Sequence, residues 1–171
     1  MRIQHFIGVA TACVLAGALV VDAHAACEPF TAFTENDETE RYFSDLDDSG
    51  GVSTGDKRLI GLVLLDAAGA QIGERYMSVT VLETNADGSA GPIRVDSISI
   101  LEDGVILDSS VDTQTLVRSV DNTDRPPRNP SDVRIWPVVG GMGAYAGATG
   151  TVTSTVSEDG GSEIVFTLVC E

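Results

Sequence analysis

The chain has 171 residues, of which 26 are Asp or Glu and only 10 are Lys or Arg, so its formal net charge at neutral pH is −16. This acidic surplus argues against binding to nucleic acid or to anionic membrane surfaces, because both repel a negatively charged protein. Solubility outside the cell is the simplest interpretation of the charge, and weak cation binding is the alternative.

The first 25 residues have the order of a secretory signal peptide. Arg2 precedes an apolar run from Phe6 to Val21, and Ala23-His24-Ala25 forms a small-x-small cleavage site. Cleavage there leaves about 146 residues (171 minus 25), which suits a single domain over 26–171. An uncleaved anchor helix fits less well, because the apolar run is shorter than the ~18–20 residues of a membrane span. We therefore expect a secreted or periplasmic protein with no membrane span in its mature form.

Cleavage also changes the chemistry that the mature chain can perform. Both histidines, His5 and His24, lie in the signal, so the mature chain has no histidine for a Ser-His-Asp triad or for a metal site. Cys27 and Cys170 remain at the two ends, and two cysteines in an exported protein usually pair. A lipoprotein role for Cys27 is the alternative, but His24 stands where a lipobox has an aliphatic residue. We predict a Cys27–Cys170 disulfide that closes nearly the whole domain.

After residue 26 the sequence shows the alternating or short apolar runs that are typical of β-strands, and no helical period. Strands are expected at Glu40 to Leu46, Arg58 to Leu65, Gln71 to Glu83, Ile93 to Leu101, Val105 to Val111, Asp112 to Val120, Val133 to Val139, Ala148 to Val156 and Ile164 to Cys170. Glu102-Asp103-Gly104 predicts a hairpin turn, Asp121 to Asp132 with its three prolines predicts a loop, and Gly140-Gly141-Met142-Gly143 predicts a glycine turn.

Several of these strands are apolar on both faces. A closed barrel buries one face of each strand in its interior, so a second apolar face needs another cover. We therefore predict a barrel that forms a homo-oligomer. A two-sheet sandwich is the alternative, and it leaves the second apolar faces unexplained. In Ala148 to Val156, threonines at every second position share one face; β-propensity explains them better than an ice- or polysaccharide-binding ladder does.

Two segments, Tyr42 to Gly73 and Val138 to Thr155, resemble the allene oxide cyclase-like barrels, which are relatives of plant dirigent proteins. The second segment is the more specific, because it matches the family's GGxGxF/YxGAxG turn-and-strand. The matching residues are Gly140, Gly141, Gly143, Tyr145, Gly147, Ala148 and Gly150. Gly55-Asp56 ahead of an apolar strand and the closing Glu163 to Leu168 fit the same pattern. The similarity spans most of the mature chain but is diffuse between residues 85 and 130.

The resemblance implies an all-β, eight-stranded antiparallel β-barrel, commonly trimeric, with a pocket inside the barrel. The family includes fatty-acid epoxide cyclases, dirigent proteins that steer the coupling of phenoxy radicals, and bacterial cyclases that accelerate cycloadditions. All of them hold a reactive molecule in one conformation, and such proximity catalysis needs no cofactor. We expect a cofactor-free barrel that binds an apolar or amphipathic small molecule and directs its cyclisation or isomerisation. A non-catalytic carrier or dirigent scaffold and a purely structural secreted domain are the alternatives.

The resemblance also points to site residues. An acidic residue on the family's first strand faces the cavity, which makes Glu38, Glu40 and Arg41 the candidate catalytic residues. A carboxylate in a dry pocket has a raised pKa and can polarise an epoxide or a carbonyl; a solvated strand edge is the simpler alternative.

Five further residues are candidates for lining the pocket. An inward-facing arginine can anchor a carboxylate ligand, and tyrosine or tryptophan can line an apolar cavity. Each of these residues must be weighed against an ordinary surface, core or rim position. The candidates are Arg75, Arg94, Tyr76, Trp136 and Tyr145.

The segment Asp45 to Gly50, followed by Asp56, resembles a calcium-binding loop. Its candidate ligands are Asp45, Asp47, Ser49 and Asp56, with glycine at the sixth position. The twelfth position is Asp rather than Glu, and no helices flank the segment. An ordinary strand connection is therefore the simpler interpretation, and we expect no metal.

Overall fold

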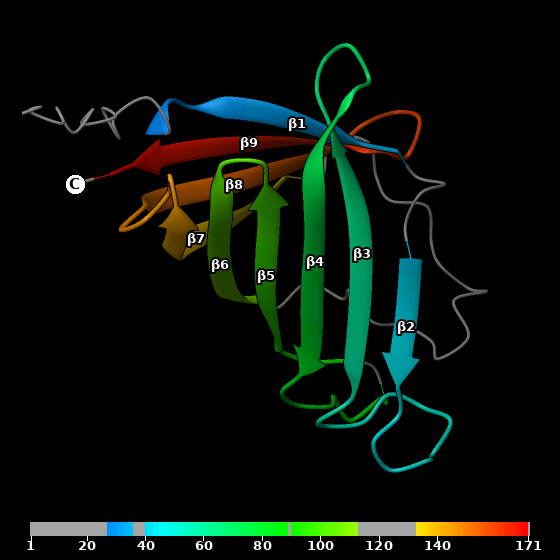
Figure 1. Cartoon of the computed structure of the whole chain (residues 1–171). Coiled ribbons are helices and arrows are strands. Elements are labelled where there is room, and N and C mark those ends of the chain that lie inside the picture. The colour runs from blue at the N-terminus through cyan, green and yellow to red at the C-terminus, as the bar shows by residue number, and fades with distance from the viewer. Residues whose placement is uncertain (1–26, 36–39, 89, 113–132, 171) are drawn as a thin grey trace, which may run out of the picture.

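The computed structural model describes residues 27–35, 40–88, 90–112 and 133–170, with the backbone alone at Glu40 and Arg41. This part of the chain forms nine β-strands (Figure 1). They are β1 (Phe30–Thr34), β2 (Glu40–Ser44), β3 (Lys57–Leu65), β4 (Gln71–Val81), β5 (Ile93–Leu101), β6 (Gly104–Asp112), β7 (Val133–Gly143), β8 (Thr149–Val156) and β9 (Ser162–Val169).

The strands form one antiparallel sheet in the order β1-β9-β8-β7-β6-β5-β4-β3-β2. A further pairing between β1 and β3, at Phe33 and Leu65, closes eight of the strands into a barrel. Strand β2 is additional and pairs with β3 on its other side. The predicted eight-stranded antiparallel barrel is therefore confirmed, and the two-sheet sandwich is excluded.

The barrel has two halves that cross steeply. In Figure 1, β3 to β6 run nearly vertically, whereas β1, β9 and β8 run nearly horizontally behind them. Alternation along each strand sends every second side chain into the interior, as the pleat requires. The buried apolar residues of the strands are Ala32, Leu64, Met77, Val79, Val81, Ile93, Val95, Ile106, Trp136, Val138, Val152, Val156, Ile164, Phe166 and Leu168.

One strand, β1, was not predicted. Its sequence, FTAFT, is short and contains two threonines, so the alternation is weak. Tertiary contacts hold it in place instead: β1 pairs with β9, and the ring of Phe30 stacks on that of Phe166 with 4.5 Å between centroids. A strand that depends on a partner at the far end of the chain leaves little local signal.

The predicted glycine turn at Gly140 to Gly143 is wrong, because β7 continues through these residues and pairs with β6. A Cβ on Gly141 would lie 2.8 Å from the carbonyl oxygen of Val105, and one on Gly104 would collide with the carbonyl oxygen of Met142. The glycines therefore permit two strands to approach closely. The chain turns only afterwards, over residues 144–148.

The predicted disulfide is confirmed. Cys27 and Cys170, 143 residues apart, join the segment before β1 to the end of β9, with 5.9 Å between their Cα atoms. A disulfide agrees with an oxidising, extracytoplasmic location. The predicted signal peptide, residues 1–25, lies outside the described residues. Within the described ranges, no helix has the length and apolar character needed to cross a membrane.

Candidate functional site

A groove of about 880 Å³ lies on the outer face of β2 to β6. We call this surface the groove face. Small residues create the hollow. Ser78 is the cross-strand partner of Leu59, and Gly61 is the cross-strand partner of Tyr76. Larger side chains stand around them. The groove is lined by Tyr42, Leu59, Ile60, Gly61, Tyr76, Met77, Ser78, Asp96, Ser97, Ile98 and Leu107.

Around the groove, the acidic side chains of Glu74 and Asp96 are paired with their neighbours. The Tyr76 hydroxyl donates a hydrogen bond to a Glu74 carboxylate oxygen at 2.6 Å. The Asp96 carboxylate accepts a hydrogen bond from the Ser109 hydroxyl at 2.6 Å and forms an ion pair with Arg94 at 2.9 Å. These pairings leave rings and alkyl groups as the main surface of the groove. The groove thus suits a mostly apolar molecule.

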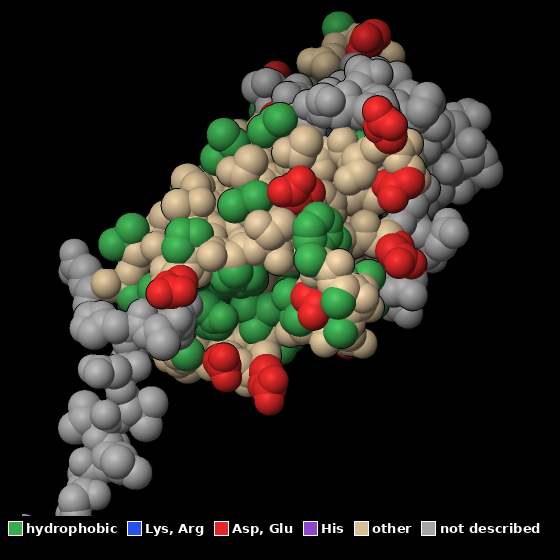
Figure 2. All heavy atoms as spheres, turned by 90° about the horizontal axis from the view of Figure 1, so that it is seen from above, with side chains coloured by type: hydrophobic (Ala, Val, Ile, Leu, Met, Phe, Trp, Pro, Cys, Tyr) green, Lys and Arg blue, Asp and Glu red, His purple; other side chains and the backbone are tan. Residues whose placement is uncertain are grey.

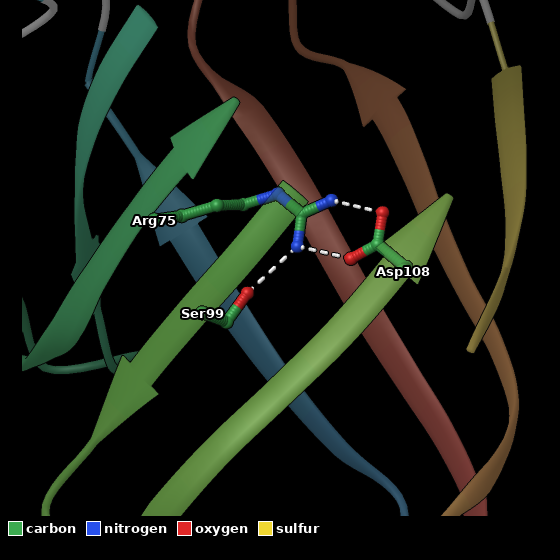
Figure 3. A network of polar contacts seen from close by, with 3 residues as sticks. All are labelled: Arg75, Ser99 and Asp108. Carbon is green, nitrogen blue, oxygen red and sulfur yellow. Dashed lines mark hydrogen bonds and ion pairs between the residues drawn. The ribbon is translucent and has the colours of Figure 1, made fainter. Parts of the chain in front are cut away.

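A buried ion pair lies in the interior, on the other side of the same strands (Figure 3). Arg75 donates from Nη1 and Nη2 to the two carboxylate oxygens of Asp108, at 2.8 and 2.9 Å, and from Nη1 to the Ser99 hydroxyl at 2.7 Å. The guanidinium carbon lies 5.4 Å from the ring centroid of Trp136, which adds a cation–π contact. Both charged side chains are fully buried. Such bidentate pairs are the strongest of the side-chain hydrogen bonds.

The ion pair supports the groove from beneath. Arg75 precedes Tyr76 in β4, and Asp108 follows Leu107 in β6, so inward charges alternate with outward lining residues. Because Arg75 contacts side chains from β5, β6 and β7, it ties four strands together at one level. A groove carried by cross-linked strands keeps a fixed shape.

The resemblance to cyclase barrels implied a pocket inside the barrel, whereas the groove described above lies outside it. Arg75, Ser99 and Asp108 are buried to within 1 % exposure, so side chains pack closely around the ion pair. Two buried polar atoms, Nε of Arg75 and the Ser97 hydroxyl, have no hydrogen-bond partner among the described residues. The interior polar site is thus incompletely satisfied, which usually indicates a bound water or a functional demand.

The predicted pocket residues divide between the two faces of the sheet. Arg75 and Trp136 both point inward and contact each other. Tyr76 points outward and lines the groove, and Arg94 points outward beside it. Their expected role in lining an interior pocket therefore does not apply to these two outward residues.

Tyr145 lies in the turn between β7 and β8. It is buried, and its ring centroid lies 6.4 Å from that of Phe30. Burial raises the pKa of the Tyr145 hydroxyl above its ordinary value of 10.0, and the negative charge of Asp103 raises it further. Tyr145 is a packing residue at one end of the barrel and lies apart from the groove.

The structure describes the candidate catalytic residues only in part. Glu38 lies outside the described residues, as do the side chains of Glu40 and Arg41. The backbone of Glu40 pairs with Gly61, and that of Arg41 pairs with Ile60, both of which line the groove. A catalytic role for these residues remains a prediction.

Sequence reasoning missed Asp108 and Ser99, the partners of Arg75. A signal was present: Asp108 stands two residues after Ile106 in an alternating strand, so a charge occupies an inward position. A charged residue at a core position requires a buried partner. The register that selects Arg75 as this partner comes only from the three-dimensional pairing.

The acidic loop between β2 and β3 brings together Asp45, Asp47 and Asp56, whose carboxylate oxygens lie within 4.8 Å of one another. Asp56 is fully buried and accepts hydrogen bonds from the Leu46 and Ser53 backbone N–H groups, at 2.9 and 2.7 Å. Hydrogen bonds from Ser49 lower the pKa of Asp47. These hydrogen bonds close the loop between β2 and β3, and this structural role accounts for the clustering of the three carboxylates. Calcium binding by Asp45, Asp47, Ser49 and Asp56 stays an untested alternative.

Comparisons with known proteins agree on the fold. No family model matches the sequence, and neither does any curated protein. Several solved structures are similar, among them the three that follow. Pyocyanin demethylase is 19 % identical with a TM-score of 0.59, over 83 % of this chain and 100 % of that chain. The Diels-Alderase AbmU from Streptomyces koyangensis is 14 % identical with a TM-score of 0.59, over 88 % of this chain and 66 % of that one.

The third similar structure is a nonspecific heme-binding cyclase that catalyses a [4 + 2] cycloaddition during neoabyssomicin biosynthesis. It is 14 % identical with a TM-score of 0.57, over 82 % of this chain and 63 % of that chain. This chain shares their barrel fold. It spans about two thirds of the length of the two cycloaddition enzymes. At these identities the similarity establishes architecture, and function must be argued from the site.

Proposed function

We propose that this chain binds an apolar or amphipathic small molecule in the groove of β2 to β6 and directs its cyclisation or isomerisation, as an allene oxide cyclase-like or dirigent-like barrel. The observation that carries the proposal is the groove itself. Its volume of about 880 Å³ lies within the ~300–1,000 Å³ that is usual for small-molecule sites. Its walls are mostly apolar, with a few polar groups placed among them, as such sites require.

The chemistry that this geometry supports is conformational. A flexible substrate held between Tyr76, Leu59 and Ile98 would lose the freedom that separates its reacting atoms. Positioning of this kind supplies up to about 7–11 kcal/mol of a reaction barrier without a cofactor. The Ser78 hydroxyl and the Asp96 carboxylate are polar groups of the groove that would orient the ligand. The cycloaddition and demethylation activities named for proteins of the same fold support a catalytic role.

A carrier or dirigent scaffold is the second candidate function. Among the side chains that the structure describes, Glu74 and Asp96 are the acidic groups at the groove, and both are engaged by neighbours, so neither is positioned as a free proton acceptor. This observation favours a groove that holds its ligand without chemistry. The close packing around Arg75 would suit a purely structural domain, which is the outcome if the groove binds nothing.

The first experiment is native mass spectrometry on the mature chain, residues 26–171, purified from an oxidising compartment. We expect a co-purified neutral organic molecule, or saturable binding of the neutral dye Nile red. The variant Ser78→Trp fills the groove and should lose both signals. Val111→Trp, at an exposed position of the same face outside the groove lining, is the matched control and should keep them.

An assay for turnover then distinguishes a cyclase or isomerase from a carrier. The co-purified molecule, or a panel of linear polyenes and unsaturated epoxides, is incubated with protein and analysed by chiral chromatography for a product of identical mass. An isomeric product that forms with wild type, and not with Ser78→Trp, supports a cyclase or isomerase. Binding without conversion supports a carrier. If wild type neither retains a molecule nor binds the dye, the proposal is wrong and a structural role remains.

A further inference from the structure

The two exposed basic side chains that the structure describes both stand at one end of the groove. Lys57 on β3 and Arg94 on β5 point outward on either side of Thr80 on β4, because Thr80 is the cross-strand partner of both. This row lies two residues along the strands from the lining residues Ser78 and Asp96. Two residues of a strand span only ~6.6 Å, which long basic side chains can cross. We call Lys57, Thr80 and Arg94 the donor row.

Arg94 is directed toward the groove by an acidic residue of the groove lining. Its Nε donates a hydrogen bond to Oδ1 of Asp96 at 3.0 Å, and the Ser109 hydroxyl donates to the same oxygen at 2.6 Å. Because Asp96 follows Arg94 by two residues on the same face of β5, this contact bends the arginine side chain along the strand toward the groove. Its Nη1 and Nη2 groups form no hydrogen bond or ion pair with the residues that the structure describes. Their N–H groups are therefore available to a ligand.

The charges around the groove favour a neutral acceptor over an anion. Among the outward side chains that the structure describes on β2 to β6, two are positive and two are negative, so their charges cancel. They are Lys57, Arg94, Glu74 and Asp96. The whole chain carries a net charge of −16, which repels an anion at long range. Arginine and lysine offer only donors. Donors without a local surplus of positive charge suit an uncharged oxygen.

The opposite end of the groove has no such donors among the described side chains. Its outward row across β3 to β6 consists of Val63, Glu74, Ile100 and Val105. The polar member, Glu74, is an acceptor that the Tyr76 hydroxyl already engages. The view from above looks onto the end of the barrel where the β3–β4 hairpin lies. Acidic and hydrophobic side chains are visible there among the described residues, and hardly any basic one (Figure 2). The groove therefore has a direction, with donors at one end.

We infer that the donor row binds the acceptor oxygen of a neutral ligand, of the carbonyl, lactone or epoxide class, and so sets the direction in which the ligand lies in the groove. Arg94 is the main donor, because Asp96 and Ser109 hold it in place, and Lys57 is the second. The apolar part of the ligand then lies over Gly61 and Ile98, which line the groove. This inference rests on the function proposed above, since it takes the groove as the ligand site.

The test is displacement of Nile red from the mature chain by three compounds of nearly equal shape. Methyl naphthyl ketone offers a neutral oxygen, isopropenylnaphthalene has a CH2 group in its place, and naphthoate carries a carboxylate. The affinity of Nile red is measured first for each variant. On wild type, the ketone should bind about tenfold more tightly than the alkene, because it gains a hydrogen bond from a charged donor. It should also bind more tightly than naphthoate.

Four variants examine the donor row. Arg94→Met keeps the alkyl stem and removes the donors, so it should weaken the ketone about tenfold and leave the alkene within about twofold. Lys57→Met should give a smaller loss of the same kind, because no described contact holds Lys57 over the groove. Asp96→Asn releases Arg94 and leaves a surplus positive charge, so it should reduce the preference for the ketone and strengthen naphthoate.

The fourth variant, Thr167→Glu, is the matched control. It changes the net charge by the same unit as Arg94→Met, at an exposed position of β9 on the other half of the barrel. The affinities of all the compounds should stay as in wild type. Unchanged thermal unfolding of each variant confirms that folding is intact.

The outcomes separate this inference from the proposed function. Equal affinities of wild type for the ketone and the alkene, or an equal loss of both in Arg94→Met, would overturn the inference and leave the groove as a binding site. Tightest binding of naphthoate to wild type would also overturn it, and would assign the donor row to an anionic head group. If wild type binds neither Nile red nor any of the naphthalenes, the proposed function fails and the inference fails with it.

Discussion

The groove face and the opposite outer face over β7, β8 and β9, here the threonine face, belong to one continuous sheet, yet their surfaces differ. On the groove face, Gly61 and Ser78 stand among aromatic and long aliphatic side chains, so the surface is hollowed, and its described acidic groups are paired locally. On the threonine face, neighbouring side chains are mostly β-branched and of similar size, so the surface is filled, and Glu163 is the one charged residue among its described outward positions on β8, β9 and the Val133–Val139 part of β7. Side-chain volume, rather than backbone architecture, thus separates the hollowed surface from the filled one.

The two halves also differ beneath their surfaces. Behind the groove face lies the buried Arg75–Asp108 ion pair. Behind the threonine face the buried side chains of β8 and β9 include Val152, Ile164 and Phe166, and the disulfide closes that half at its edge. Both halves thus contain buried apolar side chains, and they differ in the additional element, which is an ion pair in one half and a covalent link in the other.

The largest expected effect comes from breaking the ion pair. Asp108→Asn leaves the Arg75 guanidinium buried without a counter-charge, and loss of one partner of a buried pair costs about 3–5 kcal/mol. Urea unfolding should show a loss of this order. The double variant Arg75→Met, Asp108→Leu should recover most of it, because it removes both charges and keeps apolar volume. A double variant as unstable as the single one would contradict this account of the groove half.

Removing the disulfide tests the other half. Replacing both Cys27 and Cys170 by alanine should lower the free energy of unfolding by about 2–5 kcal/mol, since the bond closes a loop of 143 residues. The same variant should bind a groove ligand with unchanged affinity when it is folded, because the bond joins β1 to β9 and lies away from the groove lining. A weakened ligand affinity at full folding would show that the two halves are not independent.

The sequence predicted the strands better than it predicted which side of them faces inward. Alternation placed Met77 and Val79 on one face of β4 and Tyr76 on the other, and the structure confirms that division. Because both faces contain large apolar side chains, hydrophobicity alone could not tell that Met77 points into the barrel and Tyr76 away from it. Tyr76 was therefore predicted to line an interior pocket, although it lines the groove on the outside of the barrel.

The buried network was harder still to predict. Arg75 and Trp136 were singled out by residue type, but they lie 61 positions apart and meet only because β4 and β7 share the barrel interior. Strand order and register decide such contacts, and neither is encoded within any single strand.

Two substitutions at Tyr76 test which part of this side chain contacts a ligand in the groove. Its hydroxyl is engaged by Glu74, so the ring is the part that it offers to a ligand. Tyr76→Ala should weaken binding of a groove ligand by about tenfold, or ~1.4 kcal/mol, whereas Tyr76→Phe should leave it within about twofold. Isothermal titration with the co-purified molecule, or fluorescence titration with Nile red, measures both. Equal losses would mean that the hydroxyl, and not the ring, contacts the ligand.

The smallest expected effect concerns pH and falls on Tyr145, at one end of the barrel. Burial, and then the charge of Asp103, raise the pKa of Tyr145 above its ordinary value of 10.0 in the folded state. Above pH 10 the unfolded chain loses this proton more readily than the folded chain does, so the folded state binds more protons. Stability therefore falls as pH rises from about 10 toward the raised pKa, and is unaffected below that range.

Urea unfolding of wild type and Tyr145→Phe between pH 8 and pH 11.5 isolates this contribution. The two stability curves should run parallel up to about pH 10, after which wild type alone should lose the part that belongs to Tyr145. Asp103→Asn should reduce the difference without abolishing it, since burial is the larger cause. Because Tyr145 packs on Phe30, and Phe30 on Phe166, ionisation of Tyr145 weakens the aromatic packing at this end of the barrel.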